Sequence, residues 1–117
     1  MIRVLVVEDS ATAREFLLQI LNSDPSIEVV GTAETGEEAI EAVERTRPDI
    51  ITMDVHMPRM NGFDATRRIM ETNPTPIVIV SGAADATDTA KAFRAIESGA
   101  VAVLRKPSGV GHPDLHQ

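Results

Sequence analysis

Five polar residues each stand where a short apolar run ends, and their side chains are of types that could do chemistry together. They are Glu8 and Asp9 after the first run, Asp54 after the third, Ser81 after the fourth and Lys106 after the fifth. A carboxylate at the end of a buried segment is costly in free energy unless a cation or hydrogen bonds compensate its charge. The recurrence of such residues at the ends of apolar runs therefore indicates a shared site.

The chemistry that this set favours is phosphoryl transfer rather than acid–base catalysis. Carboxylates that gather in one place repel one another unless a cation lies among them, and a site with oxygen ligands and no cysteine suits Mg²⁺. Asp54, beside such a cation and Lys106, is a candidate nucleophile toward phosphorus. Ser81 could donate a hydrogen bond to a phosphoryl oxygen.

The elements that must position these residues are five apolar runs with helical patterns between them. The runs are continuous and rich in Val and Ile, which is typical of strands buried on both faces of a parallel sheet. They cover residues 2–7, 27–30, 50–53, 77–80 and 100–104. The order βαβαβαβαβ predicts a doubly wound α/β domain whose strand carboxyl ends share one edge, where such folds bind ligands.

The four helices are predicted from apolar spacing and from their end signals. The first has an apolar stripe from Ala13 to Leu21 that includes Phe16 and Ile20, and the second begins with a capping box of Thr35 and Glu38. The third is expected over 63–71, after an Asn-Gly pair. The fourth is expected over 85–98, closed by Gly99, with Phe93 and Ile96 as its only large apolar anchors. It should therefore bury little area and shift readily.

The totals describe one small acidic domain. The chain has 117 residues, no cysteine, a formal net charge of −7 and 3% aromatic residues. This acidity, without a run of Lys and Arg, argues against nucleic-acid binding. The run from Val4 to Val7 is interrupted by Glu8 and Asp9, so it is too short for a signal peptide or a membrane span. We expect a soluble, cytoplasmic protein that contacts neither nucleic acid nor membrane.

Each candidate residue also has a purely structural interpretation. Asp9 could cap the first helix, Glu8 could be a solvated loop acid, and Asp54 could cap a helix or stabilise a turn. Ser81 precedes a glycine, which is an ordinary turn pair, and His56 could be a half-exposed loop residue.

Four motifs together resemble the response-regulator receiver domain of two-component signalling, over essentially the whole chain: "VVEDS", "DVHMPRMNG", "VIVSGAA" and "LRKP". The resemblance implies a flavodoxin-like sheet of strand order 2-1-3-4-5 and a phosphoryl group taken from a histidine kinase. It implies roles for seven residues: Asp54 as phosphoacceptor, Glu8 and Asp9 as Mg²⁺ ligands with Asp54, the backbone carbonyl of His56 as a further ligand, Ser81 as the switch hydroxyl, and Lys106 as the site lysine with a cis bond to Pro107. The output surface would be the fourth helix and fifth strand.

The stretch "KPSGVGHPDLHQ", with "AIESGAVAVLRKP", is more narrowly similar to the receiver of chemotaxis protein-glutamate methylesterases. This likeness implies a receiver domain over 1–107, a linker or mobile tail over 108–117, and a following esterase domain that acts on chemoreceptors. The chain itself would catalyse only its own phosphorylation and dephosphorylation.

Two departures from the family pattern stand out. Val103 occupies the place where most receivers have an aromatic side chain that changes position on activation, so a switch of that kind is not expected here. Receivers also end in a fifth helix, and this chain stops before one. A shortened chain, an unstructured end or a partner chain that covers the exposed sheet face would each explain this.

Three other functions fit parts of the pattern less well. A stand-alone receiver could shuttle phosphate without an effector domain. An aspartyl-phosphate phosphohydrolase of the dehalogenase type needs a second Asp two residues after the nucleophile, where His56 stands. A nucleotide- or flavin-binding domain would want a glycine-rich turn after the first strand, and "EDSATA" contains no glycine.

Overall fold

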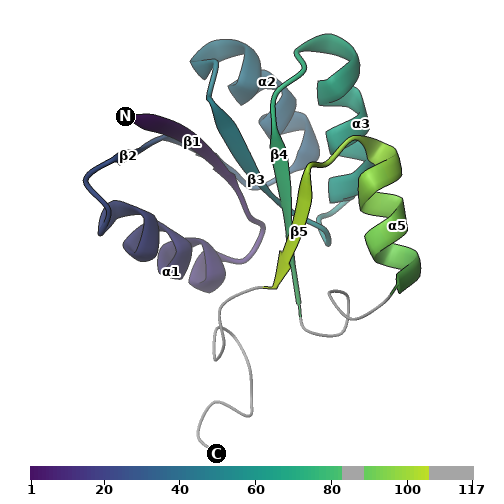
Figure 1. Cartoon of the computed structure of the whole chain (residues 1–117), viewed down its shortest axis with the longest axis horizontal. Coiled ribbons are helices and arrows are strands. Elements are labelled where there is room, and N and C mark those ends of the chain that lie inside the picture. Colours follow the sequence, from purple (N-terminus) through teal and green to yellow (C-terminus); the bar gives the residue numbers. More distant parts are fainter. Residues whose placement is uncertain (83–88, 106–117) are drawn as a thin grey trace, which may run out of the picture.

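Five parallel strands form one sheet in the order β2-β1-β3-β4-β5 in the computed structural model, which describes residues 1–82 and 89–105. The strands are β1 (Ile2–Val7), β2 (Ile27–Ala33), β3 (Ile50–Asp54), β4 (Ile77–Ser81) and β5 (Ala102–Arg105). The predicted flavodoxin-like sheet and its strand order are confirmed (Figure 1). The expected absence of a fifth helix concerns residues beyond those described.

Four helices lie within the described residues, and each connects two parallel strands. They are α1 (Ala11–Asn22), α2 (Gly36–Thr46), α3 (Gly62–Thr72) and α5 (Thr89–Ser98). The helix predicted over 85–98 agrees with α5 from residue 89 onward, and its first four residues lie outside the described part. None of these helices is long and apolar enough to span a bilayer.

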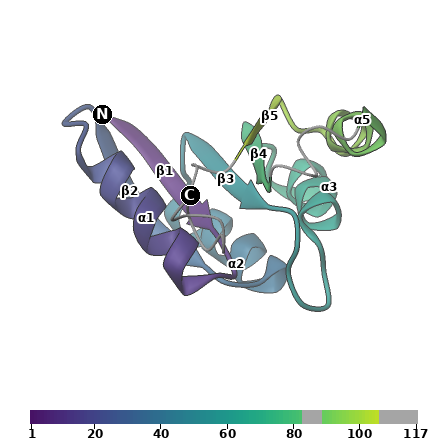
Figure 2. The ribbon, with the colours of Figure 1, turned by 90° about the horizontal axis from the view of Figure 1, so that it is seen from below.

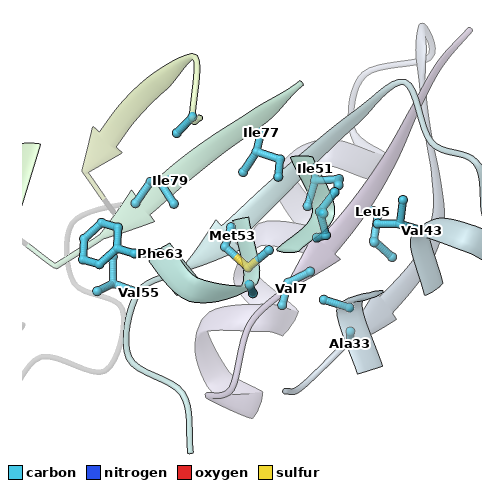
Figure 3. Packing of buried hydrophobic residues seen from close by; sticks show 14 of the residues in the cluster. Leu5, Val7, Ala33, Val43, Ile51, Met53, Val55, Phe63, Ile77 and Ile79 are labelled. Carbon is cyan, nitrogen blue, oxygen red and sulfur yellow. The ribbon is translucent and has the colours of Figure 1, made fainter. Parts of the chain in front are cut away.

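One face of the sheet carries the main core. Alternate residues of β1, β3 and β4 point to this face and pack against α2, α3 and α5. Figure 3 shows the packing, with Phe63 of α3 close to Val55 and Ile79. The largest side chains of this core that are fully buried come from the central strands: Leu5, Ile51, Met53, Ile77 and Ile79, together with Ile69 of α3.

The intervening residues of these strands face the opposite side of the sheet, where α1 packs against β1 and β2. Figure 2 shows α1 beside these two strands, with α3 and α5 near β4 and β5. Val4 and Val6 are buried on this side but do not belong to the main core cluster. Helices therefore cover both faces, as a doubly wound domain requires.

The apolar stripe predicted for α1 is only partly buried. Ala13 is the one buried residue of α1, whereas Phe16 is 39% exposed and Ile20 is 45% exposed. A 3.6-residue period identifies the apolar side of a helix, but neighbouring elements decide how much of that side is covered.

The prediction that Phe93 and Ile96 anchor the fourth helix is wrong. They are 69% and 57% exposed, and α5 is held instead through the small residues Ala95 and Ser98, which are buried. Arg94 adds a contact to α3, since its guanidinium carbon lies 4.9 Å from the centre of the Phe63 ring. Because both large apolar side chains are exposed, the part of α5 whose side chains the structure describes buries little apolar area, as expected.

The helix caps decide two of the structural alternatives. Ser10, not Asp9, caps α1, because its side chain accepts a hydrogen bond from the Ala13 amide. Asn61, not Asp54, caps α3 in the same way. The interpretations of Asp9 and Asp54 as helix caps are therefore wrong.

The predicted capping box of α2 forms with one change. The Glu38 amide donates to Thr35 Oγ1 at 3.1 Å, and the Glu38 carboxylate accepts from the Glu34 amide at 3.3 Å rather than from the amide of the cap residue. Gly99 follows α5 with φ of 111°, a conformation that suits glycine at a helix end.

Candidate functional site

The register of the sheet brings the strand ends that carry the candidate residues to one edge. Val7 pairs with Met53 across β1 and β3, and Ser81 pairs with Arg105 across β4 and β5. Glu8 comes directly after Val7 and Asp54 directly after Met53, so the two carboxylates follow on neighbouring strands, which lie about 4.8 Å apart in a sheet. By the alternation of side chains along a strand, both residues belong to the set that faces α1.

Asp54 and Glu8 are both buried, although each carries a carboxylate. Asp54 is 3% exposed at the end of the central strand, and Glu8 is 1% exposed. Glu8 is held by its surroundings, because its Oε2 accepts from the Ser10 amide at 3.1 Å and its carbonyl accepts from Arg14 at 2.9 Å. Arg14 also forms an ion pair with Glu34 at 3.0 Å. The interpretation of Glu8 as a solvated loop acid is therefore wrong.

Asp9 differs from these two acids because it is exposed. Among the residues of the two described ranges, no three His, Cys, Asp or Glu side chains gather closely enough to hold a metal ion. Two buried carboxylates on adjacent strands do fit Mg²⁺, which takes one or two carboxylates and completes its shell with water and phosphate oxygens. The carboxylates at this edge are thus of a chemistry that suits a magnesium ion.

The loop after Asp54 is closed tightly onto the end of β3. The Gly62 amide donates to the Val55 carbonyl at 2.8 Å, so α3 begins directly against the end of the strand. Within the loop, the Met60 amide donates to the Pro58 carbonyl at 2.7 Å, and Arg59 has φ of 67°. The side chain of His56 is exposed, as the structural alternative expected.

Ser81 is the last residue of β4 and is only 2% exposed. Its Oγ makes no hydrogen bond to any part of the chain that the structure describes. Buried hydroxyls usually bond to the chain, to water or to a ligand, so Ser81 is a candidate hydrogen-bond donor to a group bound at this edge. Asp54 pairs with Val80, which places Ser81 one residue beyond the neighbour of the carboxylate. Lys106 and its bond to Pro107 lie outside the described residues.

Two glycines support this edge and were not predicted to belong to it. A Cβ on Gly62 would lie 2.0 Å from the carbonyl oxygen of Asp54, so only glycine lets α3 approach the strand this closely. A Cβ on Gly36 would lie 2.8 Å from Sδ of Met60, in the loop after Asp54. For Gly62 the sequence signal is the Asn-Gly pair at 61 and 62, which predicts a helix start but not the close approach to Asp54.

The comparisons with known proteins define the class. The family model of the response regulator receiver domain matches residues 4–116, and the chain belongs to this family of two-component signalling domains. The resemblance drawn from the four motifs is thereby confirmed, and it takes precedence over the phosphohydrolase and flavin-binding alternatives.

The particular relatives are methylesterases. The chain is 62% identical over 114 residues, 97% of its length, to a protein-glutamate methylesterase/protein-glutamine glutaminase of Nitrosospira multiformis, and covers 32% of that protein. The response regulator domain of Thermotoga maritima CheB matches with a TM-score of 0.87 and 40% identity, over 100% of this chain and 87% of that one. The narrower likeness to the methylesterase receiver is confirmed. The chain spans about a third of the length of the curated relatives that it matches.

A third match was solved in complex with ligands. It is a chain of the CheX-CheY-BeF3-Mg²⁺ complex from Borrelia burgdorferi, with a TM-score of 0.81 and 28% identity. The match covers 91% of this chain and 78% of that chain.

Proposed function

We propose that Asp54 accepts a phosphoryl group from a phosphohistidine of a sensor kinase. The observation that carries this proposal is a carboxylate that is 3% exposed at the end of the central strand, with a second buried carboxylate following the neighbouring strand β1. A carboxylate oxygen of Asp54 would attack the phosphorus in line with the departing nitrogen. The new P–O bond forms as the P–N bond breaks, and the imidazole that leaves keeps the electron pair.

The residues around Asp54 would manage the charge that the phosphoryl group brings. Mg²⁺, when bound, supplies positive charge that neutralises the phosphoryl oxygens, and Glu8, Asp9, Asp54 and the carbonyl of His56 are its proposed ligands. Lys106 is proposed to place its ammonium group against another phosphoryl oxygen. Similarity to a receiver solved with BeF3 and Mg²⁺ supports this assignment.

Ser81 is proposed as the sensor of phosphorylation. Its buried hydroxyl has no partner among the described residues, and a phosphoryl oxygen on Asp54 would be its acceptor. Movement of Ser81 toward that oxygen would also shift the backbone of β5, since Ser81 pairs with Arg105. The output surface is then α5 and β5, where Phe93 and Leu104 are 69% and 55% exposed.

The proposed parent protein is a chemotaxis methylesterase in which this receiver controls an esterase domain that acts on chemoreceptors. The names of the relatives and the third of their length that this chain covers support the proposal. The proposed compartment is the cytoplasm, where the kinase would meet it.

The test is incubation with a small phosphodonor, an acyl phosphate or a phosphoramidate, in the presence of Mg²⁺, with intact mass as the readout. Wild-type protein should gain the mass of one phosphoryl group, and Asp54→Asn should gain none. An equal gain in both proteins would place the reaction on another residue. No gain in either would reject the phosphoacceptor function.

A further inference from the structure

The first residue of α2 packs against the loop that follows Asp54. Gly36 is buried, and Met60 fills the space that a side chain at this position would occupy. A Cβ built on Gly36 would lie 2.8 Å from Sδ of Met60 and 3.0 Å from its Cβ and Cγ. The contact involves Cβ of Met60, which no side-chain rotation moves, as well as its flexible end, so rotation would relieve only part of it.

The loop needs such support because its backbone is strained at Arg59. This residue has φ of 67°, and the amide after it donates back to the carbonyl before it, from Met60 to Pro58 at 2.7 Å. These are the features of a γ-turn with positive φ at its centre, a rare and strained conformation. Strain of this kind persists only where surrounding contacts hold it, and it gathers at functional sites.

The strained turn is joined to α2 by a packing contact and by an ion pair. The packing contact is that of the Met60 side chain against Gly36. The other is an ion pair of 3.4 Å between Arg59 and Glu37, whose side chains are 71% and 48% exposed. An ion pair so open to solvent contributes little. Met60, which is partly buried against the main core, therefore makes the stronger of these two contacts with α2.

We propose that Gly36 and Met60 form a clamp that positions the loop over residues 55–61 for the reaction at Asp54. The hydrogen bond from the Gly62 amide to the Val55 carbonyl holds the two ends of the loop together. The clamp then fixes the course of the backbone between these ends. That path carries His56, whose carbonyl is a proposed ligand of the cation. Gly36 and Met60 are positioning residues, and their effect on the reaction rests on the proposed function of Asp54.

Gly36→Ala separates this role from that of an ordinary helix residue. Gly36 stands at the start of α2, where alanine has the better helix propensity, so propensity alone predicts that the variant folds at least as well as wild type. The clamp predicts instead that the added methyl displaces Met60 and loosens the turn.

Gly31→Ala is the matched control. A Cβ on Gly31 would meet Cδ1 of Leu5 at 3.5 Å and Cγ2 of Thr46 at 3.7 Å, which are ordinary contacts. Met60→Ala is the second variant, because it leaves Gly36 unchanged and removes the other half of the clamp. It keeps the proposal open to refutation if Gly36→Ala does not fold.

The first readout is amide hydrogen exchange at Met60 and Gly62 in the metal-free protein. The clamp predicts that the amide of residue 60, corrected for the intrinsic rate of the residue type, exchanges about tenfold faster than in wild type in Gly36→Ala and in Met60→Ala, with no change in Gly31→Ala. Unchanged exchange in both clamp variants would overturn the proposal. This result does not depend on whether Asp54 is phosphorylated.

The second readout is the rate at which the small phosphodonor modifies Asp54. A displacement of about 1 Å can slow a reaction by up to about 100-fold, so we expect a loss of about 10- to 100-fold in both clamp variants. The double variant should be no slower than Met60→Ala alone, because the two substitutions remove the same contact. Normal rates in both single variants would overturn the clamp, whereas failure of wild type to react would reject the phosphoacceptor function and leave the exchange result to decide the clamp.

Discussion

Replacing Gly62 by alanine should destabilise the protein and disturb Asp54, because the added methyl would collide with the backbone of the phosphoacceptor. The Cβ would lie 2.0 Å from the carbonyl oxygen of Asp54, 2.9 Å from its carbonyl carbon and 3.1 Å from Cα of Val55. All three are backbone atoms, so no rotation of a side chain can relieve the contact.

The size of the effect follows from the movement required. The methyl and the oxygen must separate by about 1 Å to reach 3.0 Å, a distance below which Cβ contacts are essentially never seen. Overpacking in a core costs about 1–3 kcal/mol when side chains can adjust. Here no side chain can adjust and α3 must move away from β3, so the cost should exceed that range, at about 4 kcal/mol. The better helix propensity of alanine offsets up to about 1 kcal/mol of it. We expect a net loss of about 3 kcal/mol in the free energy of unfolding.

Urea unfolding of wild type and Gly62→Ala measures this loss, which corresponds to a fall of roughly 10 °C in the melting temperature. Gly82→Ala is the control, because a Cβ on Gly82 would meet no atom of the described residues within 4 Å. It should change stability by no more than about 0.5 kcal/mol. If Gly62→Ala were as stable as the control, α3 would not abut Asp54 as described and the reasoning would be wrong.

Three further predictions concern single groups. Ser81→Ala should keep or raise the free energy of unfolding, by up to about 1 kcal/mol, because it removes a buried hydroxyl without a described partner; a loss above that amount in urea unfolding would contradict this. The pKa of Asp24 should lie below its ordinary value of 3.8 in an NMR titration, since its carboxylate accepts hydrogen bonds from the side chain and amide of Ser26, and Ser26→Ala should raise it. The stability that this lowered pKa provides is present above pH 3.8 and is lost as the pH falls through the pKa of the folded state. Mg²⁺ should raise the melting temperature by mass action, and Asp9→Ala should abolish the rise; an undiminished rise in that variant would remove Asp9 from the ligand set.

The fold was predictable because each strand is a run of branched apolar residues. The predicted and observed limits of β1 agree, and those of β3 and β4 differ by one residue, since the run ends where the polar site begins. The limits of β2 are less accurate. This strand continues through Gly31 and Thr32 to Ala33 after a register shift beside Leu5, and neither Gly31 nor Thr32 carries an apolar signal.

The types of residue at the site were predictable, whereas their support was not. Parallel strands must end at one edge, so Glu8, Asp54 and Ser81 could be grouped before any coordinates were known. The contact of Gly36 with Met60 joins two segments whose packing depends on the angle between α2 and the loop. No local pattern encodes that angle. The burial of Glu8 was also not predictable, because it depends on partners contributed by α1.

The central claim is that Asp54 is the residue that carries the phosphoryl group, and chemical trapping tests it most directly. Borohydride reduces an acyl phosphate of aspartate to homoserine and leaves free carboxylates unchanged, so peptide sequencing by mass spectrometry can locate the modified residue. After treatment with a small phosphodonor and Mg²⁺, we predict homoserine at position 54 and at no other aspartate. Homoserine at Asp9 or another aspartate, or none at position 54 in a protein that has gained a phosphoryl group, would contradict the claim.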